Sequence, residues 1–286
     1  MILLTGASGK TGKAIIKALS NSEIICAFVH RESSIAPLKA LGVKKVVVGD
    51  LRDKTAIRSS MEGVRAVYHV CPNMSPDEIQ IGGTIIGEAK KADVERFVYH
   101  SVLHPQTEKM AHHWAKLRVE ELLFESGLPF TILQPAPYMQ NLLAGWKSIV
   151  EESTLRVPYS VNAKFSFIDL EDLAEAARIV LTETIHVNAT YELAGTFSTS
   201  HVDVAKIFGR VLGKDIRAEV EEIRVWRSRA EGLSAYALEN LVRMFEYYDQ
   251  WGLAGNPNVL RWLLKREPTS LEQFIERITK ERNSPL

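Results

Sequence analysis

The chain opens with Met1-Ile2-Leu3-Leu4-Thr5-Gly6-Ala7-Ser8-Gly9-Lys10-Thr11-Gly12, and apolar residues at helical spacing follow as far as Leu19. A short apolar run, three glycines spaced three apart and a helical pattern predict a strand, a tight turn and a helix. In such a turn Gly6 permits the bend, Gly9 lets the backbone approach a phosphate, and Gly12 lets helix and strand pack closely. Because free N–H groups at the start of a helix face an anion, the stretch predicts a site for the pyrophosphate of a dinucleotide. We expect six residues to contact it: Gly6, Ser8, Gly9, Lys10, Thr11 and Gly12.

Strand-like and helix-like segments alternate through the first half of the chain. The predicted strands are residues 24–30, 45–48, 66–70, 96–100 and 130–134. The predicted helices are residues 35–41, 54–61, 79–91 and 109–126. Short connections between them imply parallel strands joined by right-handed crossovers, with helices on both faces. The predicted fold is therefore α/β, a doubly wound parallel sheet (a Rossmann fold), whose ligand crevice lies at the carboxyl ends of the strands.

The pattern loosens after Gln134. There we expect a helix at 141–150, a strand at 165–168, a helix at 170–182 and a short strand at 190–193. Helical patterns dominate from Ser198 on, and we expect residues 281–286 to fray. The predicted domains are a dinucleotide-binding domain at 1–140, with returns at 163–195, and a smaller, mainly helical substrate-binding lobe at 141–162 and 196–286. The aromatic residues Phe245, Tyr247, Tyr248 and Trp251 could stack on a planar ligand, but a packed helix face is the favoured interpretation.

Composition excludes several classes of protein. Of 286 residues, Lys plus Arg and Asp plus Glu number 35 each, so no global field attracts nucleic acid. No apolar run reaches about 18 residues, which argues against a membrane span, and a strand that begins at residue 1 leaves no room for a targeting peptide. We therefore expect a soluble, cytoplasmic protein. Cys26 and Cys71 lie in apolar runs, where buried free thiols are expected rather than a disulfide framework.

The end of the second predicted strand indicates which dinucleotide binds. NAD-specific folds usually carry Asp or Glu about 20 residues after the glycine turn, to hold the ribose 2′-hydroxyl. Here that place is occupied by His30 and Arg31. Because a guanidinium pairs with a 2′-phosphate, Arg31 favours NADPH over NADH, although it could also be a solvated surface charge. Asp50 and Leu51, after the third strand, are expected to flank the adenine.

Several motifs together resemble the NmrA-like branch of atypical short-chain dehydrogenase/reductases. They are the glycine turn, His30-Arg31, Gly49-Asp50, the strand 97–101 and the stretch 116–135. The stretches 101–104, 191–195 and 267–274 are similar to the bacterial quinone-oxidoreductase members. The resemblance implies a flavin-free reductase that transfers hydride to a quinone-like or other conjugated acceptor, such as an azo compound. The alternative is a non-catalytic NADP(H)-sensing regulator that acts through protein partners, because this branch includes both enzymes and redox-sensing regulators.

Typical short-chain dehydrogenases use a Ser, a Tyr and a Lys four residues after the Tyr. By this resemblance Ser101 and Lys116 are candidate catalytic residues, but His112 stands at the Tyr position. His112 and Lys116 are i and i+4 on a helix, so both can face one site, and His113 is also in reach. His112 is then either a proton donor, since its ordinary pKa is near neutrality, or a helix surface residue. Lys116 either holds the nicotinamide ribose or forms a solvated ion pair with Glu120.

The remaining site predictions come from strand ends and from the resemblance. Cys71 and Pro72, after the fourth strand, are expected to border the cofactor ribose, and Pro135 and Tyr138 to line the nicotinamide side. Tyr138 and Asn141 are the candidates for contact with substrate, a small-molecule electron acceptor. The spacing of the histidines suits no metal site, so neither a metal nor a flavin is expected. The identity of the substrate is not readable from the sequence, and a homo-oligomer and a protein partner both stay open.

Overall fold

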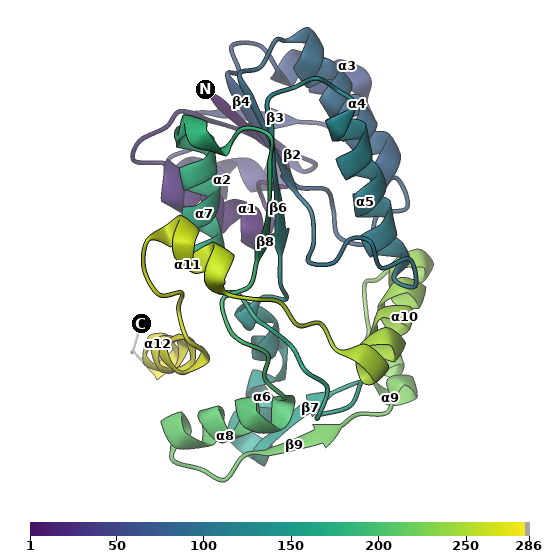
Figure 1. The fold of residues 1–286 in the computed structure, drawn as a ribbon, viewed down its shortest axis with the longest axis vertical. Coiled ribbons are helices and arrows are strands. Elements are labelled where there is room, and N and C mark those ends of the chain that lie inside the picture. The colour runs from purple at the N-terminus through teal and green to yellow at the C-terminus, as the bar shows by residue number, and fades with distance from the viewer. Residues whose placement is uncertain (284–286) are drawn as a thin grey trace. The chain divides into compact units, whose positions relative to one another are not determined.

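The main sheet has seven strands in the order β3-β2-β1-β4-β5-β6-β8 in this computed structural model, which describes residues 1–283 (Figure 1). The neighbouring strands from β3 to β6 all pair in parallel. The strands are β1 (Ile2–Leu4), β2 (Ile25–Val29), β3 (Lys45–Val48), β4 (Ala66–His69), β5 (Arg96–His100), β6 (Phe130–Pro135) and β8 (Ala189–Leu193). The predicted doubly wound α/β fold is confirmed.

Helices cover both faces of this sheet: α1, α2 and α7 lie on one side, and α3, α4 and α5 on the other (Figure 1). They are α1 (Lys10–Leu19), α2 (Ile35–Ala40), α3 (Lys54–Ser60), α4 (Glu78–Lys91), α5 (Ala111–Phe124) and α7 (Leu170–Thr182), with short 3₁₀ turns η1 (Glu32–Ser34) and η3 (Thr184–His186). Strands β1, β2, β4 and β5 are buried along their whole length, because helices cover both faces.

The strand order reverses between β1 and β4. From β1 the chain proceeds outward through β2 and β3, then returns to place β4 on the other side of β1. Leu4 is in register with Ala27 on one side and with Tyr68 on the other. In an open α/β sheet such a reversal separates the loops that leave the two strands, and ligands bind in the crevice between them. The loops after β1 and β4 are therefore the expected ligand site.

An apolar core lies between the sheet and the helices α3, α4 and α5. Its largest members include Phe28, Phe97 and Tyr99, all at most 2% exposed. Both cysteines, Cys26 and Cys71, belong to this cluster and are free, as predicted. Burial of apolar surface stabilises a fold by about 25 cal/mol per Å². The burial of this core is therefore the main source of stability for this half of the fold.

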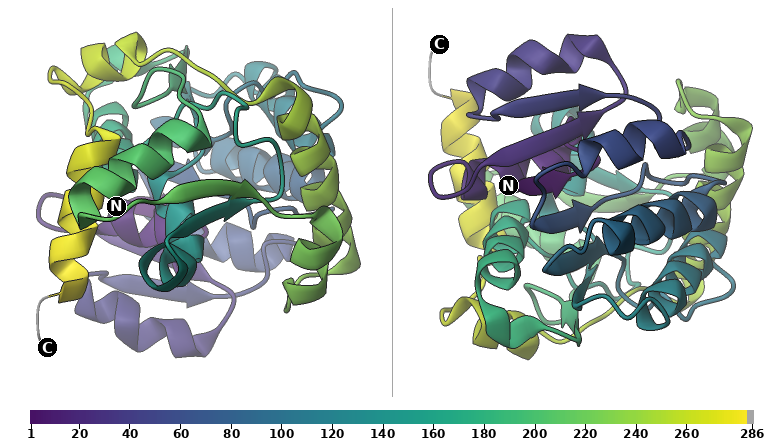
Figure 2. Two further views of the ribbon diagram at one scale, coloured as in Figure 1. Left: turned by 90° about the horizontal axis from the view of Figure 1, so that it is seen from below. Right: turned by 90° about the horizontal axis from the view of Figure 1, so that it is seen from above.

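The chain divides into two compact units, Met1–Gln134 with Leu173–Tyr191, and Pro135–Asp172 with the residues from Glu192 onward. The second unit contains η2 (Met139–Gly145), α6 (Trp146–Glu152), β7 (Thr154–Val157), α8 (His201–Leu212), β9 (Arg217–Val220), α9 (Ile223–Arg229), α10 (Ala235–Trp251), α11 (Asn258–Leu264) and α12 (Leu271–Asn283). Its strands β7 and β9 form a separate parallel pair, seen side by side in the left view of Figure 2.

Two predictions for the second unit differ from the structure, and two strands were missed. The helix expected at 141–150 is a 3₁₀ segment up to Gly145 followed by a short α-helix. The strand expected at 165–168 is a buried irregular segment, because its backbone bonds go singly to scattered loops: Ser166 N donates to Leu253 O, and Ile168 N donates to Pro137 O. The strands β7 and β9 were not predicted, since Thr154–Val157 and Arg217–Val220 carry charges within four-residue runs.

The aromatic residues of α10 mostly pack within the second unit. Phe245 and Tyr248 are buried, and both rings lie within 6 Å of the Tyr159 ring. Tyr247 is half-buried, whereas Trp251 is 64% exposed. The favoured interpretation, a packed helix face, is confirmed for Phe245 and Tyr248. Of the segment expected to fray, Glu281 and Arg282 belong to α12, and 284–286 lie outside the described residues.

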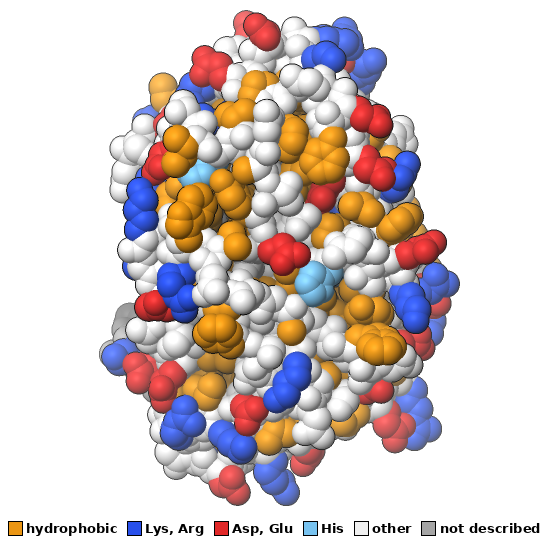
Figure 3. Space-filling view, in the orientation of Figure 1, with side chains coloured by type: hydrophobic (Ala, Val, Ile, Leu, Met, Phe, Trp, Pro, Cys, Tyr) orange, Lys and Arg blue, Asp and Glu red, His pale blue; other side chains and the backbone are white. Residues whose placement is uncertain are grey.

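The surface carries charges of both signs. On the face shown in Figure 3, Lys and Arg side chains are interspersed with Asp and Glu, without a large area of one sign. Within residues 1–283, no helix combines the length and apolar character that a membrane crossing requires.

Candidate functional site

The turn between β1 and α1 has the geometry that its glycines predict. Gly6 adopts a φ of +61°, in the left-handed region that favours glycine. At Gly12, a Cβ would lie 2.5 Å from Gly6 O, so only glycine allows the helix to pack this closely. At Gly9, by contrast, a Cβ would meet only Gly6 O, at 3.3 Å. The turn is therefore tight on its inner side and open at Gly9.

The start of α1 is free to bind an anion. Gly9 is the N-cap residue of α1, and no side chain caps the helix there. The first N–H groups of a ten-residue helix are then directed at whatever occupies the open side of the turn, and the helix dipole favours negative charge at this end. Ser8, Gly9 and Lys10 are all exposed. These features fit the pyrophosphate of a dinucleotide.

A buried polar cluster fixes the turn to the end of β4. The Thr5 hydroxyl donates to Val70 O at 3.0 Å and accepts a hydrogen bond from Val70 N at 2.9 Å. Since its single hydrogen goes to Val70 O, the hydroxyl oxygen accepts from His69 Nδ1, which lies 2.8 Å away. Burial lowers the pKa of His69 to about 4, so this histidine is neutral at pH 7. These hydrogen bonds thus connect the turn after β1 to the start of the loop after β4, the two segments that border the expected crevice.

The charged residues after β2 and β3 differ in their surroundings. Arg31 follows β2 and is exposed, and among residues 1–283 its guanidinium has no ion-pair partner. Asp50 follows β3 and accepts from Arg52 Nε at 3.0 Å, which with further bonds from Arg52 lowers its pKa well below the ordinary range. The negative charge of Asp50 is therefore compensated by Arg52, a residue that the sequence analysis did not single out. Leu51 lies beside it, half-buried.

Lys116 is on α5, and its ammonium group lies at the carboxyl end of β5. There it pairs with Glu78, an acid on α4. Its Nζ is 2.9 Å from Glu78 Oε1 and 3.4 Å from His100 O, and the two side chains are 12% and 5% exposed. The Tyr99 hydroxyl donates to the same Glu78 oxygen at 2.9 Å. Burial opposes ionisation of Glu78, but the Lys116 charge and hydrogen bond outweigh it and hold its pKa below the ordinary value. The ion pair considered between Lys116 and Glu120 is not formed.

Glu120 instead belongs to a second buried cluster, with Ser101. The Ser101 hydroxyl donates to Glu120 Oε1, and Gln134 Nε2 donates to both carboxylate oxygens at 2.9 and 3.0 Å. Burial raises the pKa of Glu120, and these donors oppose the shift. Ser101 is 2% exposed, so its hydroxyl hydrogen is engaged inside the protein.

The two adjacent histidines of α5 pack against each other. Their rings meet edge to face, with centroids 4.5 Å apart. His113 is 1% exposed, and its Nδ1 lies 3.1 Å from His104 O, so that nitrogen carries a proton. Burial, together with electrostatic repulsion from a protonated His113 and from Lys116, lowers the pKa of His112 to about 3. His112 is therefore neutral at pH 7 and stays neutral under mildly acidic conditions, where an ordinary histidine would be an imidazolium.

The loop after β4 contains Cys71, which is buried, and Pro72, which is exposed. Burial raises the pKa of the Cys71 thiol well above its ordinary range, so it is a thiol at neutral pH. Within the described chain, no group of three or more His, Cys, Asp or Glu side chains could hold a metal ion.

The sequence was compared with models of known protein families. Residues 1–278 match the NmrA-like family. The chain belongs to the NmrA-like family. The resemblance found in the sequence motifs is thereby confirmed over nearly the whole chain.

Relatives of this NmrA-like chain include characterised reductases. It is 30% identical over 220 residues to the NAD(P)H azoreductase of Xenophilus azovorans, covering 76% of each chain. It is 27% identical over 219 residues to quinone oxidoreductase 2 of Escherichia coli, again covering 76% of each. Among solved structures, the NADPH complex of the E. coli NADPH-dependent quinone oxidoreductase QOR2 has a TM-score of 0.85 at 24% identity, covering 98% of this chain and 100% of that one. This last likeness shows the shared fold.

In this NmrA-like chain the segment Pro135–Asp172, which begins at the last residue of β6, belongs to the second unit. Pro135 is buried, Tyr138 is half-buried and Asn141 is exposed. Tyr138 forms a parallel bridge with Ile168, which anchors this segment by backbone bonds. The predicted contacts of Pro135 and Tyr138 with nicotinamide, and of Tyr138 and Asn141 with substrate, stay predictions.

Proposed function

We propose that this NmrA-like protein is an NADPH-dependent, flavin-free reductase that passes hydride to a quinone-like or other conjugated acceptor, azo compounds included. The observation that carries the proposal is the glycine turn at the β1/β4 switch point, with its uncapped helix start and its open side at Gly9. The azoreductase and quinone oxidoreductase relatives support the class of acceptor.

Two arginines support NADPH over NADH. Arg31 presents an exposed guanidinium at the end of β2, where a 2′-phosphate would pair with it. Arg52 compensates the negative charge of Asp50, after β3, which would otherwise repel that phosphate. In this proposal the backbone of the glycine turn binds the pyrophosphate, Asp50 and Leu51 flank the adenine, and Cys71 and Pro72 border the ribose.

Hydride transfer to a quinone-like acceptor requires little general-acid catalysis by the protein. The bound nicotinamide supplies hydride, and a quinone that accepts one hydride and one proton becomes a hydroquinone, leaving NADP⁺. Lys116 donates to the ribose hydroxyls and its positive charge favours the anion that forms on the acceptor. Because His112 is neutral at pH 7, water is the second candidate source of the proton, and the donor role of His112 stays a prediction.

A second candidate function is a non-catalytic NADP(H)-sensing regulator that acts through protein partners. Two observations favour it: a neutral histidine occupies the position of the usual tyrosine acid, and the Ser101 hydroxyl is engaged with Glu120. A sensor requires affinity for the dinucleotide but no turnover.

Turnover assays separate the two functions. NADPH consumption is followed with a panel of quinones and azo dyes, using protein freed of flavin and of metal. We expect steady consumption that falls by at least about tenfold in Lys116→Ala, since a hydrogen bond from a charged group is lost. Lys90→Ala, which removes an exposed lysine of α4, is the control and should match the wild type. NADPH binding without turnover of any acceptor would instead support the sensor.

A further inference from the structure

The ion pair between Glu78 and Lys116 joins two helices, α4 and α5, across the carboxyl end of β5. Glu78 Oε1 accepts from Lys116 Nζ and from the Tyr99 hydroxyl, both at 2.9 Å. The Lys116 ammonium also lies 5.5 Å from the centre of the Tyr99 ring. The shorter of the two hydrogen bonds of this ammonium goes to a carboxylate oxygen that a buried tyrosine also holds, and the longer one, at 3.4 Å, goes to the backbone carbonyl of His100.

Stability alone does not explain this pair. Removing two charges from water carries a desolvation penalty that their attraction often fails to offset, and apolar pairs of similar volume are commonly as stable. The apolar core around α4 and α5 could accommodate such a pair, since Ile81, Ile85 and Val119 are packed there. The lysine also keeps 12% of its side chain exposed, so the ammonium is not sealed inside the protein. These features are those of a charge that is held in place for a ligand.

The other acid within reach on α5 does not compete for this lysine. Glu120 is one turn from Lys116 but accepts instead from Ser101 and Gln134. The remaining titratable groups around Lys116 are uncharged at neutral pH, because burial holds His69, His100, His112 and His113 neutral and Tyr99 protonated. Glu78 is thus the charged group that holds the ammonium in place.

We propose that Glu78 is a positioning residue of the dinucleotide site, which holds the Lys116 ammonium at the end of β5 for contact with the nicotinamide ribose, and that Tyr99 holds Glu78. This proposal rests on the proposed function, because it assumes that Lys116 contacts the cofactor. Glu78 acts through Lys116 and does not itself touch the ligand.

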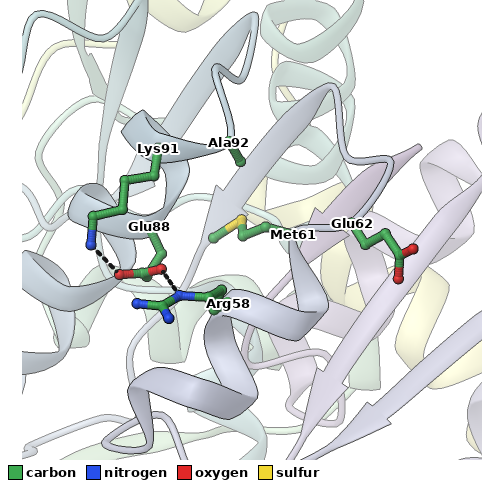
Figure 4. A pocket seen from close by; sticks show the side chains of 6 residues that line it. All are labelled: Arg58, Met61, Glu62, Glu88, Lys91 and Ala92. Carbon is green, nitrogen blue, oxygen red and sulfur yellow. Dashed lines mark hydrogen bonds and ion pairs between the residues drawn. The ribbon is translucent and has the colours of Figure 1, made fainter.

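A double-mutant cycle on the dissociation constant for NADPH tests the proposal. The variants are Glu78→Gln, Lys116→Met and the two combined, and binding is measured by calorimetry at one pH and salt concentration. The matched control is Glu88→Gln, which removes another buried, ion-paired carboxylate from the same helix. In Figure 4 the Glu88 carboxylate lies between Arg58 and Lys91, at 2.9 and 2.7 Å, and it has no contact with Lys116.

We expect Glu78→Gln to weaken NADPH binding by about tenfold, as for a lost charge-assisted hydrogen bond, and Lys116→Met by at least as much. If Glu78 acts through Lys116, the combined variant binds no more weakly than Lys116→Met alone. Glu88→Gln should leave affinity unchanged. Circular dichroism and urea unfolding establish that each variant is folded.

Tyr99→Phe provides a second route if Glu78→Gln does not fold. It removes only the hydroxyl that holds Glu78, and we expect about a threefold loss of affinity that disappears in the Lys116→Met background. The proposal is overturned if the losses in the Glu78 and Lys116 variants multiply, or if Glu78→Gln binds NADPH as well as Glu88→Gln does. Failure of the wild type to bind NADPH would overturn the proposed function itself, and this inference with it.

Discussion

Two alanine substitutions in the glycine turn separate dinucleotide binding from folding. At Gly12 a methyl group would lie 2.5 Å from Gly6 O and 2.6 Å from the Ala7 Cα, and both are backbone atoms that cannot rotate away. At Gly9 the same group would meet only Gly6 O at 3.3 Å, and the backbone there is extended, with φ −74° and ψ 171°. The fold therefore tolerates alanine at Gly9 and not at Gly12.

The expected magnitudes follow from these contacts. Gly12→Ala should lower the free energy of unfolding by about 3 kcal/mol, the upper end of the usual overpacking range, because the backbone must shift. Gly9→Ala should change it by less than about 1 kcal/mol, in either direction, since the residue is exposed and its φ suits alanine. Its methyl group nevertheless stands where a pyrophosphate must approach the backbone, so NADPH affinity should fall by about 10-fold to 100-fold.

Urea unfolding followed by circular dichroism gives the stability of each variant, and calorimetric titration with NADPH gives its affinity. Gly87→Ala, on α4, where a Cβ would meet nothing within 4 Å, is the matched control for adding a methyl group outside the turn. A Gly9→Ala protein that is stably folded and binds NADPH as tightly as the wild type would refute the reasoning. It would mean that the turn serves the fold alone.

Two further predictions concern cofactor choice and pH. Arg31→Ser should weaken NADPH binding by roughly 10-fold, through loss of a charge-assisted pair, and leave NADH binding unchanged; equal effects on both dinucleotides would contradict the assignment. For His69, the pKa of about 4 in the folded protein lies below the ordinary 6.5, so the unfolded chain binds more protons between these values. The free energy of unfolding therefore rises with pH through this window. For one such histidine it falls by about 2 kcal/mol when the pH is lowered from 7 to 5. In urea unfolding at these two pH values, His69→Asn should show a smaller loss than the wild type, and an unchanged loss would contradict the assigned burial effect.

The features that sequence could predict are local ones. The glycine turn is readable because each glycine has a separate steric reason within a few residues, and the structure assigns those reasons to Gly6 and Gly12 directly. The strands β3 and β5 were predicted to the residue, since an apolar run bounded by turns is a strong pattern. The doubly wound topology then follows from the alternation of strands and helices.

The features that sequence could not predict depend on distant partners. Lys116 pairs with Glu78, 38 residues earlier, whereas the spacing rule for helices points to Glu120. Nothing local shows that Glu120 lies on a buried face, where Gln134 and Ser101 satisfy it. The pKa of His112 likewise depends on burial by other elements. The one signal for Glu78 was an acid in the first turn of its helix, which is common and serves the helix dipole.

The most direct test of the account is a calorimetric titration of the wild-type protein with NADPH and, separately, with NADH. The account predicts saturable binding of one NADPH per chain, tighter than NADH by about 10-fold, because Arg31 pairs with the 2′-phosphate. Absence of saturable binding for both dinucleotides would contradict the central claim that the turn after β1 is a dinucleotide site.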